Sequence, residues 1–482
     1  MRIAIVGGGT AGLAAAYELE RARAAGAQVD YTLYEERARL GGSLASEIVN
    51  GAVLERGPDS FLTEKPAAAE LCRELGLGGE LLPSNDAARK TYIVVRNRLV
   101  ALPDGLMFLV PTKLIPTALT RLFGLRTKIR MGLELLHASR PSGGDESVAA
   151  LVRRHFGQEA VDRLADPLLS GIYGGDAEQL SAQTVLPRLV EMETKHGSLT
   201  RGMLAAHKRM RDAAKNSTGP ARKAPPIFTA LRGGMSQLVD ALVARIDPAN
   251  LRTGTPVSGI KKTGSGWIVE AGGTQREYDG LIMAAPAWAA GSLLTPVDGA
   301  LGGELGGIPY SSSITLNLVY DETKIGTLPE GFGFLVPAVE GRAMLACTFV
   351  HRKFLGRTPP GKAVFRAFLG GMNREALLAE SDESLVATVR REMSEILGAR
   401  TFSADVEPEH AQVSRWRRAM AQYAVGHKER MRRIGARVAE LPGLRLVGNA
   451  YDGIGVPDCI RLGRQAAREL TGAEAKTPAL VR

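Results

Sequence analysis

The sequence predicts an α/β protein whose central element is a Rossmann-like, parallel nucleotide-binding sheet. Three observations predict this fold. A strand, a glycine-rich turn and a helix follow one another within residues 2–26, an acidic residue, Glu35, ends the next apolar run, and the strand, turn and helix order returns within residues 444–470. Together these features predict one sheet assembled from both ends of the chain.

The first unit carries the pattern G-x-G-x-x-G between a strand and a helix. Residues 2–6 (RIAIV) are typical of a buried strand, and residues 13–26 (LAAAYELERARAAG) favour a helix. Such glycines permit a tight turn, let the backbone approach a pyrophosphate and let the helix pack on the sheet, while the helix N-terminus stabilises the phosphate charge. We expect the whole turn to bind a dinucleotide: Gly7, Gly8, Gly9, Thr10, Ala11 and Gly12.

The acid after the second apolar run indicates a dinucleotide without a phosphate on the ribose 2′-hydroxyl. Glu35 follows residues 31–34, and a carboxylate there accepts hydrogen bonds from a ribose 2′-hydroxyl but disfavours a 2′-phosphate. A glycine-rich turn in some other α/β domain is the alternative interpretation of this region, and the local pattern leaves it open.

The C-terminal segment predicts a larger cofactor than NAD. Residues 444–447 predict a strand, residues 448–460 a glycine-rich turn and residues 461–470 a helix. A domain that binds a nicotinamide dinucleotide in one continuous stretch does not need this distant return. A cofactor with a second ring system far from its adenine does, which favours FAD.

Composition excludes several other classes of protein. The chain of 482 residues is too long for one core and suggests about two to three domains. Its net charge is +10, but aromatic residues are few and no nucleic-acid motif is present, so we expect no nucleic-acid partner. The cysteines, Cys72, Cys347 and Cys459, are too scattered for a disulfide framework or a metal site. The first strand begins at residue 2 and no long apolar segment follows, so we expect a cytoplasmic protein.

Two basic stretches, residues 89–140 and 201–223, leave the meaning of the charge open. Residues 114–123 carry an apolar stripe at helical spacing with basic flanks. Such a helix suits the surface of an anionic membrane, and it suits equally a helix that faces a core and has solvated charges. Residues 201–226 are basic, polar and proline-containing, which predicts a loop or linker.

Five motifs connect the two ends of the chain. They are RLGG at 39–42, ERGPDSFL at 55–62, LADPLLSGIYGGD at 164–176, GFGFLVP at 331–337 and GNAY at 448–451. Together they resemble the FAD-dependent porphyrinogen oxidases of haem biosynthesis, within the wider amine-oxidase-like flavoproteins. The first and last motifs also occur in other flavin oxidases, whereas the segments around Gly57 and Gly171 are more specific.

The resemblance implies three structural parts. They are a discontinuous Rossmann-like FAD-binding domain of the amine-oxidase type, a mixed-sheet substrate domain and a helical subdomain. By this resemblance, residues 1–64, 227–290 and 440–482 bind FAD, residues 65–90 and 291–439 bind substrate, and residues 91–226 form the helical part, whose contact with a membrane is left open.

The resemblance also implies a non-covalent FAD site. The glycine-rich turn holds the pyrophosphate, Glu35 with Glu36 binds the adenosine ribose, and Gly42 and Ser43 lie near the phosphates, although relatives often have a basic residue in place of Ser43. Backbone amides near residue 455 would stabilise the negative charge that develops on the reduced flavin. The remaining implied contacts are Gly57, Pro58, Asp59, Ser60, Val257, Trp416, Ile454, Gly455 and Val456, and ordinary core packing is the alternative for Val257 and Trp416.

The implied reaction oxidises a porphyrinogen to a porphyrin in three rounds. Each round moves a hydride to the flavin, and O2 then reoxidises the flavin and is released as H2O2. The flavin carries this chemistry, so the protein has to orient the macrocycle and exclude water, and the sequence nominates no catalytic base. The implied substrate contacts are Lys65, Leu168, Gly171, Phe334 and Met344. Helix packing is the alternative for Leu168 and Gly171, and an exposed helix-start lysine is the alternative for Lys65.

One departure from the family pattern bears on the substrate. Protoporphyrinogen oxidases usually carry an arginine before the position of Tyr92, where it pairs with a substrate propionate, and this chain has Thr91, with Arg89 and Lys90 upstream. Bacterial relatives that oxidise coproporphyrinogen III also lack that arginine, and a substrate with four propionates suits a basic pocket mouth. We therefore favour coproporphyrinogen III over protoporphyrinogen IX.

Other functions stay as alternatives. An amine or polyamine oxidase on the same fold would need an acidic or aromatic pocket, which the basic composition disfavours. A non-catalytic dinucleotide-binding or membrane-scaffolding protein belongs to a different class. The sequence leaves open whether the chain is a monomer or a homodimer, and whether a ferrochelatase receives its product.

Overall fold

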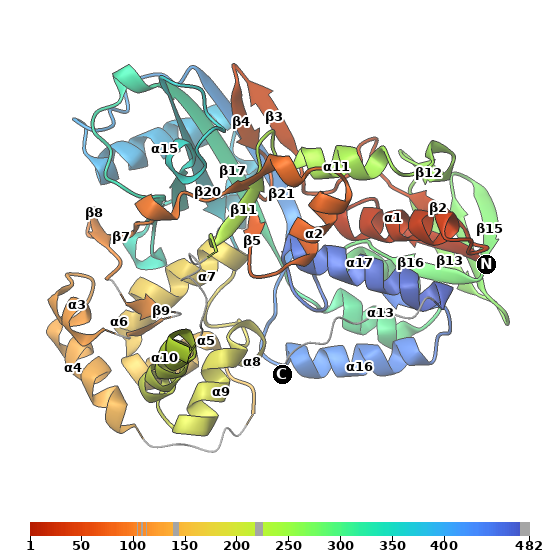
Figure 1. Ribbon diagram of the computed structural model, residues 1–482, viewed down its shortest axis with the longest axis horizontal. Coiled ribbons are helices and arrows are strands. Elements are labelled where there is room, and N and C mark those ends of the chain that lie inside the picture. Colours follow the sequence, from red (N-terminus) through yellow and green to blue (C-terminus); the bar gives the residue numbers. More distant parts are fainter. Residues whose placement is uncertain (104, 108, 112, 138–143, 217–224, 473–482) are drawn as a thin grey trace.

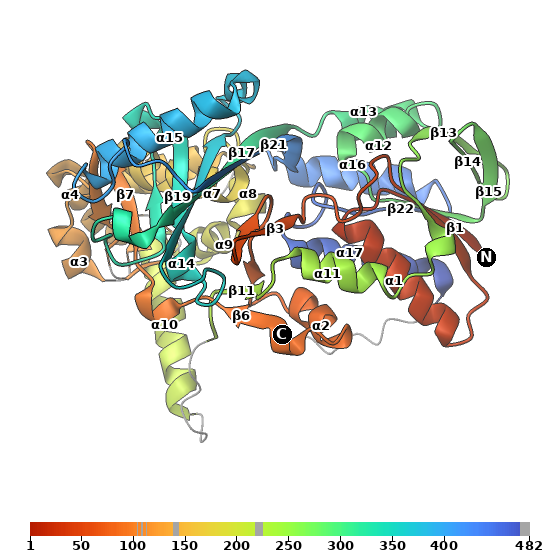
Figure 2. The same cartoon turned by 90° about the horizontal axis from the view of Figure 1, so that it is seen from above.

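The computed structural model describes residues 1–482 except 104, 108, 112, 138–143, 217–224 and 473–482. Figure 1 shows three lobes: a parallel sheet with its helices at the right, a larger twisted sheet at the upper left and a group of helices at the lower left. One helix of the third lobe, α10 (Leu199–Asn216), projects from the rest of the molecule in Figure 2.

The first lobe contains the predicted parallel sheet. Its strands all pair in parallel, in the order β12-β2-β1-β16-β22. The bounds are β1 (Arg2–Val6), β2 (Asp30–Tyr34), β12 (Leu251–Arg252), β16 (Gly280–Met283) and β22 (Leu444–Leu446). The prediction that both ends of the chain build one sheet is confirmed.

Helices from the two ends of the chain pack on each other over one face of this sheet. A Cβ on Gly463 would lie 2.1 Å from the carbonyl oxygen of Ala11, so the two backbones approach as closely as glycine allows. The helices on this face are α1 (Thr10–Ala24), α2 (Ala67–Glu74), α11 (Ser236–Val243) and α17 (Val456–Thr471).

The opposite face of the parallel sheet is covered by a small antiparallel sheet and three helices. Trp267, which is fully buried, anchors this second core. The elements are β13 (Val257–Lys262), β14 (Trp267–Ala271), β15 (Thr274–Tyr278), α12 (Ala287–Leu294), α13 (Gly299–Gly306) and α16 (His427–Ala439).

The second lobe is a mixed seven-stranded sheet, ordered β21-β17-β20-β19-β18-β7-β8. It is mixed because β18 and β7 pair in parallel while the other neighbours are antiparallel. Its strands are β7 (Thr91–Val95), β8 (Arg98–Ala101), β17 (Tyr310–Asp321), β18 (Gly333–Leu335), β19 (Met344–Phe349), β20 (Lys362–Gly370) and β21 (His410–Ala421).

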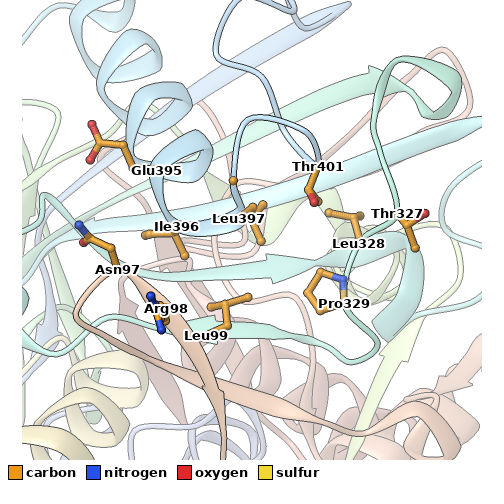
Figure 3. Close-up of a pocket in the computed structure, with 11 residues that line it drawn as sticks. Asn97, Arg98, Leu99, Thr327, Leu328, Pro329, Glu395, Ile396, Leu397 and Thr401 are labelled. Carbon is orange, nitrogen blue, oxygen red and sulfur yellow. The ribbon is translucent and has the colours of Figure 1, made fainter.

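The two faces of this sheet make different contacts: one packs against a helix, and the other donates hydrogen bonds to a hairpin. Ile314 and Leu316 point toward α15 (Asp382–Leu397) and form a core with it, whereas the alternate side chains Thr315 and Asn317 point to the other face. There they donate to backbone carbonyls beside the hairpin of β3 (Ser46–Val49) and β4 (Ala52–Glu55). On the α15 side a cavity of about 550 Å³ opens where the β7–β8 hairpin meets the end of α15 (Figure 3).

Short elements connect these lobes. Two of them, β5 (Phe61–Leu62) and β6 (Leu81–Pro83), pair with β11 (Phe228–Leu231). The helix α14 (Val350–Lys353) follows β19 directly. The pairing of β11 with β5 and β6 places the chain that leaves the helical lobe beside segments that precede it.

The third lobe is helical and has its own core. The prediction of a loop or linker over residues 201–226 is wrong for residues 201–216, which belong to α10, because the apolar residues Leu199 and Met203 pack into this core; residues 217–224 lie outside the described part. The elements are β9 (Leu106–Met107), β10 (Val110–Pro111), α3 (Leu114–Leu119), α4 (Leu125–Leu133), α5 (Val148–Phe156), α6 (Gln158–Ala160), α7 (Asp166–Tyr173), α8 (Ala182–Val185) and α9 (Pro187–His196).

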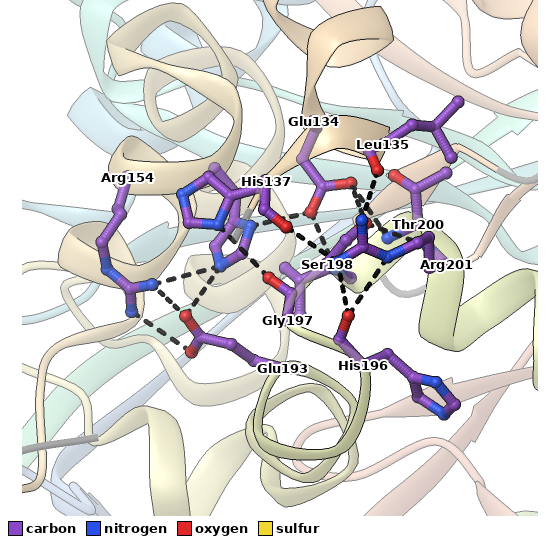
Figure 4. Close-up of polar contacts among 12 residues, drawn as sticks. Glu134, Leu135, His137, Arg154, Glu193, His196, Gly197, Ser198, Thr200 and Arg201 are labelled. Carbon is purple, nitrogen blue, oxygen red and sulfur yellow. Dashed lines mark hydrogen bonds and ion pairs between the residues drawn. The ribbon is translucent and has the colours of Figure 1, made fainter. Parts of the chain in front are cut away.

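Buried charged groups tie the helices of this lobe together (Figure 4). His155, on α5, is only 1% exposed and lies between two carboxylates. Its Nδ1 is 2.8 Å from Oε1 of Glu134, and its Nε2 is 3.1 Å from Oε1 of Glu193. Arg154 also pairs with Glu193. The cluster therefore joins the segment after α4 to α5 and α9.

Glu134 also fixes the start of α10. Its carboxylate accepts hydrogen bonds from the hydroxyl of Ser198 and from the backbone N–H groups of Leu199 and Thr200. Burial alone would raise the pKa of Glu134, but these donors and His155 hold the pKa below its ordinary value of 4.5. In the same way Arg154 holds the pKa of Glu193 below its ordinary value against the effect of burial.

We expect Glu134→Ala to destabilise the helical lobe by about 3–5 kcal/mol, because buried donors lose their acceptor. Since the folded-state pKa values of Glu134 and Glu193 lie below those of the unfolded chain, their stabilisation is present above pH 4.5 and is lost as the pH falls through the folded values. Thermal unfolding at pH 7 and at pH 4 measures both effects. Glu191→Ala, on the exposed side of α9, is the control and should leave the Tm unchanged; an equal loss in both variants would contradict the expectation.

Candidate functional site

The glycine-rich turn is shaped by contacts that exclude side chains. Gly7 has a φ of 110°, in the region that favours glycine. A Cβ on Gly12 would lie 1.9 Å from the carbonyl oxygen of Gly7, so this position tolerates no larger residue. At Gly9 a Cβ would meet only Gly42, at 3.9 Å. The turn is therefore closed toward the sheet and open on the side of Gly9.

The acid after β2 is fixed by backbone donors. Oε2 of Glu35 accepts from the N–H of Gly8 at 2.7 Å, and Oε1 accepts from the N–H of Arg37 at 2.9 Å. The N–H of Thr255 donates to the carbonyl of Glu35 at 2.9 Å, which brings the start of β13, with Val257, next to the acid. Glu36 is exposed beside it.

A second glycine turn lies against the first. Gly41 and Gly42 have φ values of 97° and 58°, and Gly41 forms a bridge with Gly9. The guanidinium of Arg39 donates to three carbonyls of this loop, those of Leu40, Gly42 and Leu44. A Cβ on Gly57 would lie only 1.9 Å from the carbonyl oxygen of Ser43, so residue 57 must be glycine. The contact connects the nucleotide turns to the segment that follows β4.

The segment from Glu55 to Ser60 is held by side chains of the seven-stranded sheet. Four of its backbone carbonyls act as acceptors, and the donors come from β17, β20, β21 and the loop after α14. Asn317 donates to the carbonyl of Glu55 at 3.0 Å, Trp416 to that of Arg56 at 2.7 Å, Arg366 to that of Gly57, and Arg357 to that of Asp59 at 3.0 Å. We call residues 55–60 with these donors the anchored segment.

Buried charges accompany the anchored segment. The carboxylate of Asp59 lies 2.9 Å from Nζ of Lys353 and 3.7 Å from Arg366. Burial by itself would raise the pKa of Asp59, but these two cations hold the pKa well below its ordinary value. Glu55 pairs with the fully buried Arg357 at 2.9 Å, and there burial raises the pKa of the carboxyl in spite of that cation.

The loop before α17 holds the remaining predicted flavin contacts. The N–H of Gly453 donates to the hydroxyl of Tyr423 at 2.9 Å, and that of Gly455 to Oδ2 of Asp458 at 3.2 Å. Among the described residues, no acceptor faces the N–H groups of Ile454 and Val456. These two donors, at a helix N-terminus, suit an acceptor or negative charge supplied from outside the chain.

Lys65 lies next to this loop rather than free in solvent. Its Nζ is 2.7 Å from Oδ2 of Asp458. Tyr173, at the end of α7, is close enough for the charge of Asp458 to add to burial in raising the pKa of the Tyr173 hydroxyl. The structure thus brings together α7, the Lys65 segment and the start of α17.

One face of α7 is turned away from the core of the helical lobe. Gly171 is exposed and Ile172 is 58% exposed, whereas the half-buried Leu168 packs against that core, as the alternative of helix packing expects. A Cβ on Gly171 would lie 3.2 Å from the side chain of Leu335 on β18, so the helix crosses close to the seven-stranded sheet. A π-helical turn at residues 161–165 precedes α7, a feature often found near functional sites.

Phe334 and Met344 do not lie beside α7. Their side chains are 2% and 0% exposed and pack in the core between the sheet and α15. The physical reason is the period of two along a strand: Leu335, the neighbour of Phe334, points to the α7 side. Neither side chain is therefore brought to the pocket expected from the sequence.

Sequence reasoning did not find the buried cations of the site. Arg366 and Lys353 approach the anchored segment from β20 and α14, and no motif marks them. Asp458 could have been suggested by its place in the first turn of α17, where an acid caps the helix. The cavity near α15 contains none of the predicted site residues.

The fold and the site define a class. A Rossmann sheet built from both ends of the chain, with a glycine-rich turn and a fixed acid after β2, is the architecture of a dinucleotide-binding oxidoreductase. The model of the family described as flavin containing amine oxidoreductase matches residues 10–471. The chain belongs to this family.

Similar proteins of known name cover the whole chain. Coproporphyrinogen III oxidase from Bacillus subtilis is 32% identical over 97% of this chain and 97% of its own length. Protoporphyrinogen oxidase 1 from Arabidopsis thaliana is 28% identical over 97% of this chain and 87% of its own length. Among solved structures, a provisionally named protoporphyrinogen oxidase from Exiguobacterium sp. 255-15 has a TM-score of 0.84 at 31% identity, covering 98% of this chain and 99% of its own. A putrescine oxidase shares the fold, with a TM-score of 0.68 at 19% identity over 98% of this chain and 100% of its own.

The residues fit the flavin that the family implies. The open side of Gly9 leaves room for a pyrophosphate, the carboxylate of Glu35 is held in place for a ribose hydroxyl, and the free N–H groups of Ile454 and Val456 suit a ring that gains negative charge. A bound flavin would supply hydride transfer, and the chain's own residues would orient the ring and shield it.

Gly57→Ala should abolish stable flavin binding, because a Cβ at 1.9 Å from the carbonyl of Ser43 forces the anchored segment and the phosphate turn apart. Gly79→Ala is a matched control, since no atom lies within 4 Å of a Cβ at that position. The measurement is the ratio of flavin absorbance to protein after gel filtration. A Gly57→Ala protein with full flavin content would contradict the expectation.

Proposed function

We propose that this protein oxidises a porphyrinogen to a porphyrin with FAD and O2, releasing one H2O2 for each of three hydride transfers. Full-length similarity to coproporphyrinogen III oxidases carries the proposal. The arrangement of the site supports it, because the exposed Gly171 and Ile172 give α7 an apolar surface against which a flat macrocycle could lie.

The favoured substrate is coproporphyrinogen III, and protoporphyrinogen IX is the second candidate. Thr91 begins β7 beside Gly333 of β18, and the exposed Arg89 and Lys90 precede it. These cations at the start of β7 suit a substrate with four propionates better than one with two. An amine oxidase activity is disfavoured, because the likeness to the putrescine oxidase is one of fold.

We infer that FAD is bound without a covalent link. The segments 1–64, 227–290 and 440–482 would supply its contacts, and residues 65–90 and 291–439 those of the substrate. Burial raises the pKa of the thiols of Cys72 and Cys459 to about 12 and also raises the pKa of Cys347. Protonated thiols are poor nucleophiles toward a flavin ring.

Aerobic turnover of the two porphyrinogens tests the proposal. The purified protein should be yellow, coproporphyrinogen III should bleach it anaerobically, and porphyrin fluorescence should appear in air with a larger kcat/KM for coproporphyrinogen III than for protoporphyrinogen IX. Each porphyrin formed should be matched by three H2O2. A flavin-loaded protein that oxidises neither substrate overturns the proposal, and the reverse preference overturns the choice of substrate.

We also propose that the enzyme is cytoplasmic and contacts the inner face of the membrane through its helical lobe. The outer surface of α3, α4 and the turn after them carries large apolar side chains that are 55–78% exposed: Ile115, Leu119, Leu125, Ile129, Leu133 and Leu136. The exposed Arg121, Arg126 and Arg130 lie among them, which suits an anionic bilayer surface. Among the described residues, none of the helices has the length and apolar character that crossing a bilayer requires.

Cosedimentation with lipid vesicles tests this contact. The wild-type protein should sediment with anionic vesicles at low salt, less so at high salt, and not with neutral vesicles. Leu125→Glu combined with Ile129→Glu should abolish sedimentation. Ile48→Glu, at an equally exposed apolar side chain on β3, is the control and should sediment like the wild type. Equal binding by both variants would show that this face is not the contact.

A further inference from the structure

A buried carboxylate lies directly behind the loop before α17. Asp458 is only 7% exposed, and its Oδ2 accepts from the N–H of Gly455. A Cβ on Gly453 would lie 2.2 Å from the carboxyl carbon of Asp458, so the loop passes over this carboxylate at a distance that only glycine permits. The acid therefore lies behind the loop whose N–H groups at Ile454 and Val456 would face the flavin of the proposed function.

A lysine from a distant part of the chain opposes this charge. Lys65 lies between β5 and α2 and approaches Asp458 to 2.7 Å, although 393 positions separate them. The Lys65 side chain is 41% exposed and that of Asp458 is 9% exposed. The other cation close by, Arg461, is already paired with Asp452 at 2.7 Å. Lys65 is thus the partner of the buried acid.

The charge of Asp458 affects the pKa values of neighbouring groups. It adds to burial in raising the pKa of Cys459, whereas Lys65 and Arg461 act in the opposite direction. It also adds to burial in raising the pKa of Tyr173. A ring that gains negative charge on reduction would meet the same field, and an uncompensated carboxylate there would disfavour the reduced state.

We propose that the Lys65–Asp458 ion pair sets the reduction potential of the bound flavin. Lys65 is then a positioning residue that cancels the charge of Asp458, instead of the substrate contact that the family resemblance implied. This inference rests on the FAD site of the proposed function. It explains why an exposed lysine is held against a buried acid at the start of α17.

A charge cycle on the flavin-loaded enzyme tests this inference. Lys65→Met leaves Asp458 uncompensated, so the potential should fall, and Asp458→Asn, which keeps an oxygen acceptor for Gly455, should raise it. The double variant should return close to the wild-type potential. A tenfold change in the preference for reduced over oxidised flavin corresponds to about 30 mV for a two-electron couple, and we expect shifts of at least this size, measured anaerobically against a reference dye at saturating FAD.

Two controls separate this role from others. Lys65→Arg retains the charge and should keep the potential, and Lys362→Met removes an ion pair of the same 2.7 Å length, with Glu409, on the second lobe and should not change it. An unchanged potential in Lys65→Met, with or without a higher KM for coproporphyrinogen III, overturns the inference while the proposed function stands. A wild-type protein that binds no flavin overturns the proposed function itself.

Discussion

The rest of the structure depends on the hydrogen bonds that side chains of the seven-stranded sheet donate to the carbonyls of the anchored segment. Residues 55–60 belong to the chain that leaves the nucleotide-binding lobe, yet their carbonyls accept hydrogen bonds from Asn317, Trp416, Arg366 and Arg357 of the other lobe. Buried carbonyls left without donors would each cost about 1–3 kcal/mol. The two sheets are therefore fixed relative to each other by the same backbone that faces the proposed flavin.

Two of these donors are buried arginines, and each of the two pairs with a carboxylate of the anchored segment. Arg357 and Arg366 are 1% and 3% exposed, which would be costly for isolated charges. Glu55 and Asp59 lie within the anchored segment itself and pair with these arginines. The carboxylates thus have two tasks at once: they neutralise the cations, and they place the cations where their remaining N–H groups reach the carbonyls.

The sequence predicted the parts of the site that are local in the chain. The turn at residues 7–12, Glu35 after β2 and the C-terminal strand and helix follow from short patterns of glycine, charge and hydrophobicity, and the structure confirms the sheet they build. The expected substrate contacts of Phe334 and Met344 are not found, because a motif identifies a strand but not the face of the sheet to which each side chain points. The contacts of Lys65 with Asp458 and of Arg366 with Gly57 join residues hundreds of positions apart, and only tertiary folding brings them together.

The pairing of buried charges also explains how a chain with a net charge of +10 can carry a site governed by backbone dipoles. Asp458 is paired with Lys65, and Asp59 with both Lys353 and Arg366, so each of these two carboxylates has a cation beside it. The N–H groups of Ile454 and Val456 add a partial positive charge that no acceptor among the described residues meets. The excess of cations lies elsewhere, on surfaces such as those of α4 and α10, where water screens it. Because each of these carboxylates is paired, removing the partner of one of them would leave a full charge beside the proposed ring.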